Sequence, residues 1–467
     1  MLTVKQGAAL SVGAVLGTGV IALPGIAAQI AGPAALVAWL ALILLSAPLA
    51  LTFAALGARF PDTGGVASYV GRAFGPRAAA VVGWSFYFAV PVGALPAATF
   101  GGAYVAAVLG GGHRTTLLTA AALVALVTAA NLGGVRVSGR VQLGLAAALV
   151  ALLLAAILTA LPSADAANLR PFAPHGWTAV GPAIAVLVWG FAGWEALTSL
   201  AADYRDPRRD VPRATWIAVG VVGVLYLAVA ATSQLVLAHP SEAPLADLLA
   251  IGFGPGSRAL TAVVAVLLTA GAMNAYFAGA ARLGAALGRD GALPAWFARG
   301  ADAGQVPRRS LAVVAGLAAA TLAVAAATGL STRPIMLAVS GSFVVVYVLG
   351  TAAAVRLLPA RSWARRTAAV ALVSVLGLLA LTGWYLLWSV LVAAAALLFV
   401  RYRLRSSTMC MAASSAEAAP PSMPTSEPIS SFSSSSPRPS SGATSRPARR
   451  SPTSSESKNS PDSVVVP

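Results

Sequence analysis

The stretch Val15-Leu16-Gly17-Thr18-Gly19-Val20-Ile21-Ala22-Leu23-Pro24-Gly25 lies inside the first long apolar segment of the chain. Glycine is about 1 kcal/mol and proline about 3 kcal/mol less favourable than alanine inside a helix. Pro24 also lacks the amide hydrogen that would bond to the Val20 carbonyl. At about 1.5 Å per residue from a start near Val4, Gly17 lies about 18 Å along the segment, close to the middle of a bilayer. The sequence therefore predicts a membrane helix that is broken at mid-depth.

A second interruption, Gly190-Phe191-Ala192-Gly193, falls in the sixth apolar segment, about 17–21 Å from a start near Ala179. Glu195 follows two residues later and is the only carboxylate within a predicted span. A carboxylate is costly in hydrocarbon, so such a residue usually faces a bundle interior or an aqueous cavity and marks an ion or substrate route. Glu195 therefore indicates a transport pathway. The alternative is a structural hydrogen bond to a neighbouring backbone group or hydroxyl.

The composition places the chain in the polytopic membrane class. Mean hydropathy is +0.81, and only 10% of the 467 residues are charged. Twelve apolar segments are long enough to cross a bilayer. They are residues 7–28, 33–57, 79–109, 116–133, 141–161, 179–200, 213–237, 258–282, 310–328, 334–357, 367–382 and 384–401.

The basic residues predict how the chain is oriented in the membrane. Of the 31 lysines and arginines, all but Arg114, Arg170, Arg258 and Arg333 fall on one side of the predicted spans or in the tail. This is the positive-inside pattern, and it predicts a multi-pass protein of the cell membrane with both termini in the cytoplasm. The net charge of +17 is then a consequence of topology, so we expect no nucleic-acid partner.

The two interruptions occupy equivalent places in two sets of five spans, residues 7–161 and residues 179–357. Because five is odd, the second set begins on the opposite side of the membrane, which is the inverted repeat of many secondary transporters. Two more helices are predicted within 367–401, so the transporter domain covers residues 1–402. Residues 403–467 are rich in Ser and Pro and are predicted to be a disordered cytoplasmic tail.

The broken helices predict a ligand that carries both charges. The helix that leaves the first break offers unpaired N–H groups near Thr18 to Val20 and a positive dipole end, which suit a carboxylate. The helices that enter the breaks end in unpaired carbonyls near Val15, Trp189 and Ala192, which suit an ammonium group. A zwitterionic amino acid satisfies both ends. Close packing between helices is the alternative explanation of each glycine pair.

Several motifs resemble the amino acid–polyamine–organocation superfamily, and the similarity extends from residue 5 to about residue 400. They are Gly17-Thr18-Gly19 with Pro24-Gly25, Phe60-Pro61 with Gly64-Gly65, Phe191-x-Gly193-x-Glu195, the run from Asp206 to Ala214, and Arg282 with Arg289-Asp290-Gly291-x-Leu293-Pro294. The stretches Gly64-Gly65-Val66-Ala67, Ala73-Phe74-Gly75 and Pro91-Val92-Gly93-Ala94-Leu95-Pro96-Ala97-Ala98 resemble the branch that exports methionine and branched-chain amino acids. The resemblance implies an all-α fold of twelve transmembrane helices, with a 5+5 inverted repeat in which helices one and six are broken.

The resemblance also implies a substrate site. In the superfamily the glycine motif of helix one binds the substrate carboxylate, the break in helix six binds the amino group, and an aromatic residue gates the site, here Trp189. The substrate-binding residues implied in this chain are Val15, Gly17, Thr18, Gly19, Trp189, Phe191, Ala192 and Gly193.

The sequence leaves the coupling ion open between a proton and sodium. Some proton-coupled relatives place a lysine in the fifth helix, but residues 141–161 contain none. Proton coupling would rest on Glu195, because a proton that neutralises the carboxylate removes the cost of burying a charge. Thr269 and Asn274 are candidate contacts for an ion or the substrate, and Asn274 equally suits a packing role between helices. We expect no cofactor and no metal site, since the single cysteine, Cys410, is in the tail and the three histidines fall in predicted external loops.

Three classes of function compete. A secondary transporter of neutral apolar amino acids fits the aromatic and aliphatic residues around the breaks, where no second buried acid could pair with a basic side chain. An enzyme would need a nucleophile with its base, paired aspartates or a metal set within the spans, and the sequence has none. A transporter-like sensor that signals through the tail would need a foldable output segment. The expectation is proton-coupled efflux of methionine and branched-chain amino acids by a monomer or homodimer, with a general permease (uptake or exchange) as the alternative.

Overall fold

The computed structural model of the chain describes residues 3–17, 19–61, 65–134, 139–195, 201, 204–300 and 305–417. Every regular element within these ranges is helical, so the prediction of an all-α protein is confirmed. The helices are α1 (Val4–Leu16), α2 (Gly19–Ala31), η1 (Gly32–Ala34), α3 (Ala35–Arg59), α4 (Gly65–Phe74), α5 (Pro76–Leu109), α6 (Gly112–Leu132), α7 (Gly139–Ala160), η2 (Leu161–Ser163), η3 (Ala166–Leu169), η4 (Trp177–Ala179), α8 (Val180–Leu187), η5 (Val188–Phe191), α10 (Pro207–Val236), α11 (Pro244–Phe253), α12 (Ser257–Arg289), η7 (Ala295–Ala298), α13 (Arg308–Thr328), α14 (Thr332–Leu357), α15 (Trp363–Thr382), η8 (Gly383–Tyr385) and α16 (Leu386–Glu417).

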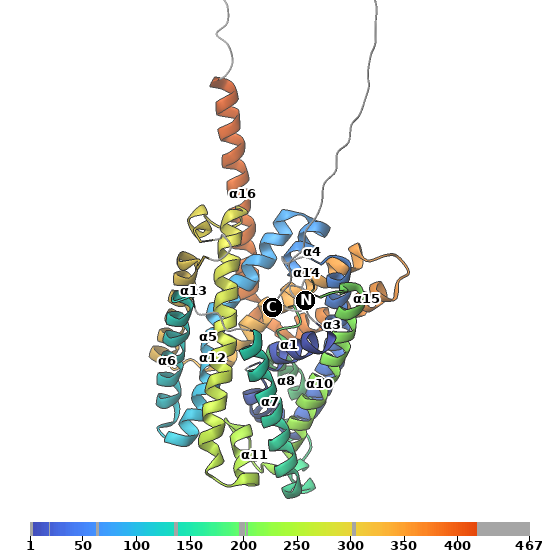
Figure 1. The fold of residues 1–467 in the computed structure, drawn as a ribbon, viewed down its shortest axis with the longest axis vertical. Coiled ribbons are helices and arrows are strands. Elements are labelled where there is room, and N and C mark those ends of the chain that lie inside the picture. The colour runs from blue at the N-terminus through green and yellow to red at the C-terminus, as the bar shows by residue number, and fades with distance from the viewer. Residues whose placement is uncertain are drawn as a thin grey trace, which may run out of the picture. The chain divides into compact units, whose positions relative to one another are not determined.

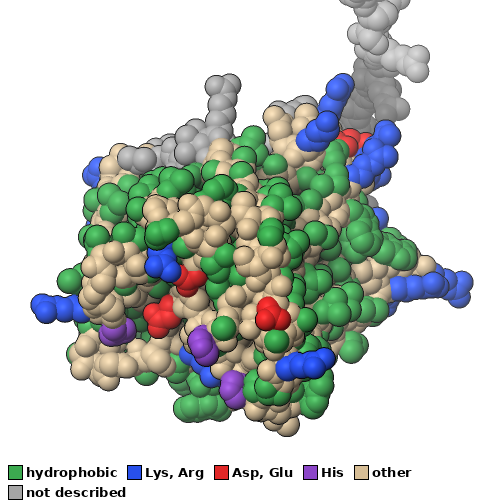
Figure 2. Space-filling model, turned by 90° about the horizontal axis from the view of Figure 1, so that it is seen from below, with side chains coloured by type: hydrophobic (Ala, Val, Ile, Leu, Met, Phe, Trp, Pro, Cys, Tyr) green, Lys and Arg blue, Asp and Glu red, His purple; other side chains and the backbone are tan. Residues whose placement is uncertain are grey.

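Nine helical stretches within the described ranges are long and apolar enough to cross a membrane. Two of them, Gly19–Arg59 and Trp363–Arg403, run on into a second predicted segment. Val4–Leu16 and Trp177–Phe191 are shorter apolar helices, as expected for spans that are broken part-way. Large exposed apolar side chains, such as Val224 and Leu398, lie on the outside, where lipid would cover them. The face seen in Figure 2 likewise shows charged side chains scattered among apolar ones.

The first predicted break is confirmed at Gly17. α1 ends at Leu16 and α2 begins at Gly19, while Gly17 has φ 30° and ψ −134°, a backbone conformation that favours glycine. Thr18 lies outside the described residues. Pro24 does not interrupt α2. In that turn Tyr104 Oη donates a hydrogen bond of 2.6 Å to the Ile21 carbonyl, which shows how neighbouring helices satisfy backbone groups near a membrane proline.

The second predicted break is confirmed as well. α8 tightens into the 3₁₀ turn η5, and Ala192 then adopts an extended backbone with φ −63° and ψ 128°. Gly193 follows with φ 131°, in the region that side chains rarely adopt. Residues 196–200 lie outside the described part of the chain. Both interruptions therefore lie in the interior, where Val15, Leu16 and Phe191 are buried.

The two broken segments lie among long helices that pass on several sides of them. Figure 1 shows α1 and α8 near the middle of the helical unit, with α7, α10 and α14 around them and α6 and α13 at one side. The contacts agree, because α1 packs on α7 and α10, α8 packs on α2 and α3, and α5 packs on α6, α12 and α14. Residues 1–411 make up this compact unit.

The last helix extends further than its apolar segment. α16 continues to Glu417, so the predicted boundary between residues 402 and 403 falls inside a helix. No glycine or proline interrupts the chain between Trp384 and Pro420, so the sequence offers no helix-breaking residue there. Residues 412–467 form a second unit, of which only the helical end up to Glu417 is described.

Candidate functional site

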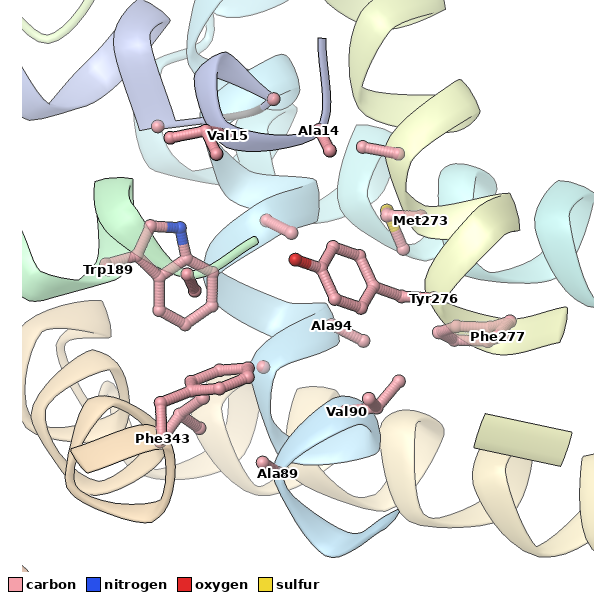
Figure 3. Close-up of a pocket in the computed structure, with 17 residues that line it drawn as sticks. Ala14, Val15, Ala89, Val90, Ala94, Trp189, Met273, Tyr276, Phe277 and Phe343 are labelled. Carbon is pink, nitrogen blue, oxygen red and sulfur yellow. The ribbon is translucent and has the colours of Figure 1, made fainter. Parts of the chain in front are cut away.

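A small enclosed space, here called the central cavity, lies where the two breaks meet. It measures about 60 Å³. Figure 3 shows the rings of Trp189, Tyr276 and Phe343 converging on it, with the Tyr276 hydroxyl directed toward Trp189. Apart from Phe277 and Met273, the rest of its wall is aliphatic or glycine backbone. The lining residues are Ala14, Val15, Gly17, Gly19, Ala89, Val90, Gly93, Ala94, Ala97, Trp189, Ala192, Ala272, Met273, Tyr276, Phe277, Val339 and Phe343.

A second space, here called the large cavity, adjoins the first and measures about 760 Å³. Ala14, Gly17, Ala272 and Tyr276 line both spaces, so they form the partition between them. The remaining lining residues come from α1, α4, α5, α7, the end of the second break, α12 and α14. They are Leu10, Gly13, Gly65, Val66, Ala67, Val82, Gly83, Phe86, Leu145, Ala146, Leu149, Gly193, Glu195, Leu268, Gly271, Ala275, Gly279, Arg282, Leu283, Ala286 and Val346.

The two breaks pack directly on each other through glycine. A Cβ atom added at Gly19 would lie 2.9 Å from the Gly190 Cα, and one added at Gly193 would lie 3.0 Å from the Ala14 carbonyl oxygen. Close packing, the alternative explanation of the glycine pairs, is therefore present here. It is compatible with a binding role, because Gly17 and Gly19 also line the central cavity.

Tyr226 of α10 ties the two breaks together, and sequence reasoning missed it. Its Oη lies 2.7 Å from the Gly190 carbonyl oxygen and 3.2 Å from the Val15 carbonyl oxygen. The Val15 carbonyl, expected to be unpaired, thus lies within hydrogen-bonding distance of this hydroxyl. A buried tyrosine within an apolar span needs a partner for its hydroxyl, and that need is the signal that points to such residues.

Glu195 is buried, with 8% of its surface exposed, and it lines the large cavity. Its Oε2 accepts a hydrogen bond of 2.9 Å from the Gly193 backbone N–H and one of 2.8 Å from Tyr347 Oη. The sequence left two alternatives for Glu195, a position facing a cavity and a structural hydrogen bond. The structure shows both. Tyr347 of α14 is a second site residue that the sequence analysis missed.

Thr18 lies outside the described residues, and the other seven implied substrate-binding residues divide into three groups. Val15, Gly17, Gly19, Trp189 and Ala192 line the central cavity. Gly193 lines the large cavity instead. Among the described residues, Phe191 lines neither.

The rings of Phe191 and Trp189 have different surroundings. The Phe191 ring packs 5.2 Å from that of Tyr226 and 6.4 Å from that of Trp39, measured between centroids. The Trp189 ring lies over Gly93 of α5 and meets Phe100 edge-on at 6.1 Å. Of these two rings, only that of Trp189 therefore lines the central cavity.

Thr269 and Asn274, the candidate ion or substrate contacts, line neither cavity within the described structure. Thr269 packs against Gly101 of α5, where an added Cβ would lie 2.9 Å from the threonine hydroxyl. Asn274 Oδ1 accepts a hydrogen bond of 2.8 Å from Asn131 Nδ2 of α6, and both side chains are buried. The geometry of Asn274 matches the packing role.

Replacing Asn131 or Asn274 with alanine should therefore lower stability and leave ion dependence unchanged. A hydrogen bond between membrane helices contributes about 0.6–1.7 kcal/mol, so each variant should lose about that much, and the double variant should lose little more than either. Thermal unfolding in detergent measures the loss, and flux with and without sodium measures the coupling. A sodium response that disappears only in Asn274→Ala would contradict this role.

These features define a class of protein, a multi-pass membrane transporter whose broken helices meet at a buried cavity. Residues 2–411 match the sequence model of the family described as amino acid permease. The chain belongs to this family, within the amino acid–polyamine–organocation superfamily, as the motifs indicated. It is a transporter and not an enzyme.

Curated relatives support the same assignment. The chain is 30% identical over 403 residues to the uncharacterized amino acid permease YecA of Bacillus subtilis, covering 86% of this chain and 95% of that protein. It is 32% identical over 406 residues to the L-methionine/branched-chain amino acid exporter YjeH of Escherichia coli, covering 84% and 94%. It is 26% identical over 340 residues to the branched-chain amino acid permease BcaP of Lactococcus lactis, covering 63% and 69%.

Proposed function

We propose that this permease exports neutral apolar amino acids, methionine and the branched-chain amino acids among them, in exchange for protons. The observation that carries the proposal is the central cavity, where aliphatic and aromatic walls adjoin the interrupted ends of α1 and η5. A charged substrate side chain would be buried there without a partner, which is unfavourable. The similarity to the exporter of Escherichia coli supports both the substrate class and the direction.

In this proposal the amino acid binds across the two breaks. The N-terminal amides of α2, which begins at Gly19, would hold the carboxylate together with the positive end of the helix dipole. The carbonyl ends of α1 and η5 would hold the ammonium group. The central cavity of about 60 Å³ is lined by the rings of Trp189 and Tyr276, so a substrate bound there would contact both rings.

The large cavity would be the cytoplasmic route to this site. It is lined by the start of α4 and by Arg282, which belong to the side that the positive-inside pattern assigns to the cytoplasm. On the opposite side the Ser241 carbonyl packs directly on Gly25 of α2, and this contact would narrow the route there. Tyr104 Oη also accepts a hydrogen bond of 3.3 Å from the Leu245 backbone N–H on the same side. In this proposal the conformation would be the inward-open state of alternating access.

The finer architecture belongs to the same proposal. Two of the nine long stretches contain two segments each, so the nine account for eleven spans. The broken helix of Trp177–Phe191 would be the twelfth. We assign residues 7–161 and 179–357 to inverted repeats, residues 1–402 to the transporter domain and residues 403–467 to a cytoplasmic tail. The protein would act in the cell membrane, with both termini in the cytoplasm, as a monomer or homodimer. A proton carried by Glu195 would be the coupling ion, with sodium as the alternative.

General uptake or exchange is the second candidate function. The similarity to a branched-chain amino acid permease of Lactococcus lactis favours it. The two candidates share the site and differ in the direction of net flux, which the driving gradient decides.

The direction can be tested in cells supplied with leucine- or methionine-containing dipeptides. Cells that carry the gene should hold less free internal leucine and methionine than cells that lack it, because the released amino acids are exported. Cells expressing an inactive variant, Gly19→Val, provide the matched control. Greater accumulation in gene-carrying cells would replace export with uptake, and movement of arginine or glutamate alone would overturn the substrate class.

A further inference from the structure

One face of α12 forms a wall of the large cavity. The lining residues on this helix recur every three or four positions, as expected for a single helical face. They are Leu268, Gly271, Ala272, Ala275, Tyr276, Gly279, Arg282, Leu283 and Ala286. Five of the nine are glycine or alanine, so the wall offers little that would contact a substrate. Tyr276 and Arg282 carry its only polar side-chain groups.

Arg282 is the only cationic side chain among the described residues that line the large cavity, and Glu195 is the only anionic one. Glu195 is buried and accepts two hydrogen bonds, whereas Arg282 is exposed. The Arg282 Nε donates a hydrogen bond of 3.2 Å to the Ala278 carbonyl of its own helix. Within the described structure its two terminal nitrogens make no hydrogen bond or ion pair, so the guanidinium is anchored at one end and presents its other donors.

The position of Arg282 places these donors on the approach to the central cavity. Tyr276 forms part of the partition between the two cavities. Arg282 follows it by six residues, about 9 Å along the helix axis. Gly279 lies between them on the same face and leaves the path along the wall open, because a Cβ added there would meet nothing within 4 Å.

We propose that Arg282 forms a carboxylate-binding subsite in the large cavity, where it captures the α-carboxylate of an amino acid before the substrate reaches the central cavity. A guanidinium presents paired donors that match a carboxylate and bind it bidentately. The same charge repels an amine that has no carboxylate. Arg282 thereby selects zwitterionic amino acids over organic cations of similar shape. This inference rests on the proposed function and adds a specificity determinant to it.

The test uses L-leucine and 3-methylbutylamine, which is leucine without its carboxylate. Purified wild-type protein, Arg282→Gln and Arg289→Gln are reconstituted, and leucine flux from the side of the large cavity is measured with the amine as competitor. Arg289 is the matched control, since it lies two turns further along α12, does not line the cavity, and lies 3.8 Å from the Asp290 carboxylate.

For Arg282→Gln we expect the leucine KM to rise about tenfold, because the contact between the guanidinium and the substrate carboxylate is lost. The kcat should stay nearly unchanged, because this contact is made before the substrate reaches the central cavity. The rise should shrink in high salt, which screens an exposed charge. Inhibition by 3-methylbutylamine should stay equal or become tighter, and Arg289→Gln should match the wild type in every measurement.

Two results would overturn the subsite. A leucine KM unchanged in Arg282→Gln would show that the guanidinium contacts no substrate. A fall in kcat with equal weakening of leucine and the amine would assign Arg282 to a gate and not to carboxylate binding. Absence of leucine flux in the wild-type protein would instead contradict the proposed function itself, so the two failures are distinguishable.

Discussion

Replacing Glu195 with glutamine should abolish the dependence of transport on the proton gradient while leucine exchange continues. Glutamine keeps one side-chain oxygen, which can still accept from the Gly193 N–H and Tyr347 Oη, the two donors now bonded to Oε2. The local geometry of the second break should therefore survive. What is lost is the capacity to bind and release a proton at the only buried carboxylate that lines a cavity among the described residues.

Flux of labelled leucine into proteoliposomes, with and without an imposed pH gradient, measures this effect. In Glu195→Gln the gradient-driven component should disappear, while exchange against internal leucine should stay within about twofold of the wild type, because neutral substrate contacts are kept. Asp290→Asn is the matched control, since it removes an exposed carboxylate at the end of α12. A pH profile unchanged in Glu195→Gln would assign this residue a purely structural role.

Replacing Gly19 with valine should cause a large loss of both substrate binding and transport, because the added side chain would separate the two breaks. The packing around Gly19 gives the reason. The added Cβ would lie 2.9 Å from the Gly190 Cα and 3.2 Å from Tyr226 Oη. Ordinary carbon contacts require about 3.5–4.0 Å. The breaks must then move apart by up to about 1 Å, and a misplacement of that size costs about 100-fold where geometry is critical.

Leucine binding and flux of purified Gly19→Val should both fall by about this factor, while the variant still inserts into the membrane. Gly220→Val is the matched control. It makes the same change in the membrane helix α10, at an exposed position where a Cβ would meet nothing within 4 Å. Wild-type affinity in Gly19→Val would show that the contact between Gly19 and Gly190 does not shape the site.

The positions of the helices could be predicted from the sequence, because runs of about twenty apolar residues and their interruptions are local features. Gly17 and Gly193 illustrate this: glycine was expected to break a helix, and both residues have φ angles that other residues rarely adopt. The family assignment was equally accessible, since its motifs are short and continuous in the chain.

The partners of the site residues could not be predicted in this way. Tyr226 and Tyr347 lie far along the chain from the breaks that they bond, and their segments look like any other apolar span. The family resemblance placed Phe191 among the candidate contacts, and polarity placed Asn274 there. The structure places Phe191 against Tyr226 and pairs Asn274 with Asn131, away from both cavities.

By itself, the sequence determined that this protein is helical, lies in a membrane, and has two helices interrupted at glycine, because hydropathy and backbone preference act over a few neighbouring residues. Tertiary structure alone decided that Gly19 meets Gly190, that Tyr347 bonds Glu195, and that Arg282 shares a cavity with that carboxylate. Membrane helices are nearly uniform in polarity, so hydropathy says little about which of their faces meet. Those choices depend on how side chains from distant helices fit together and satisfy each other's polar groups in the interior.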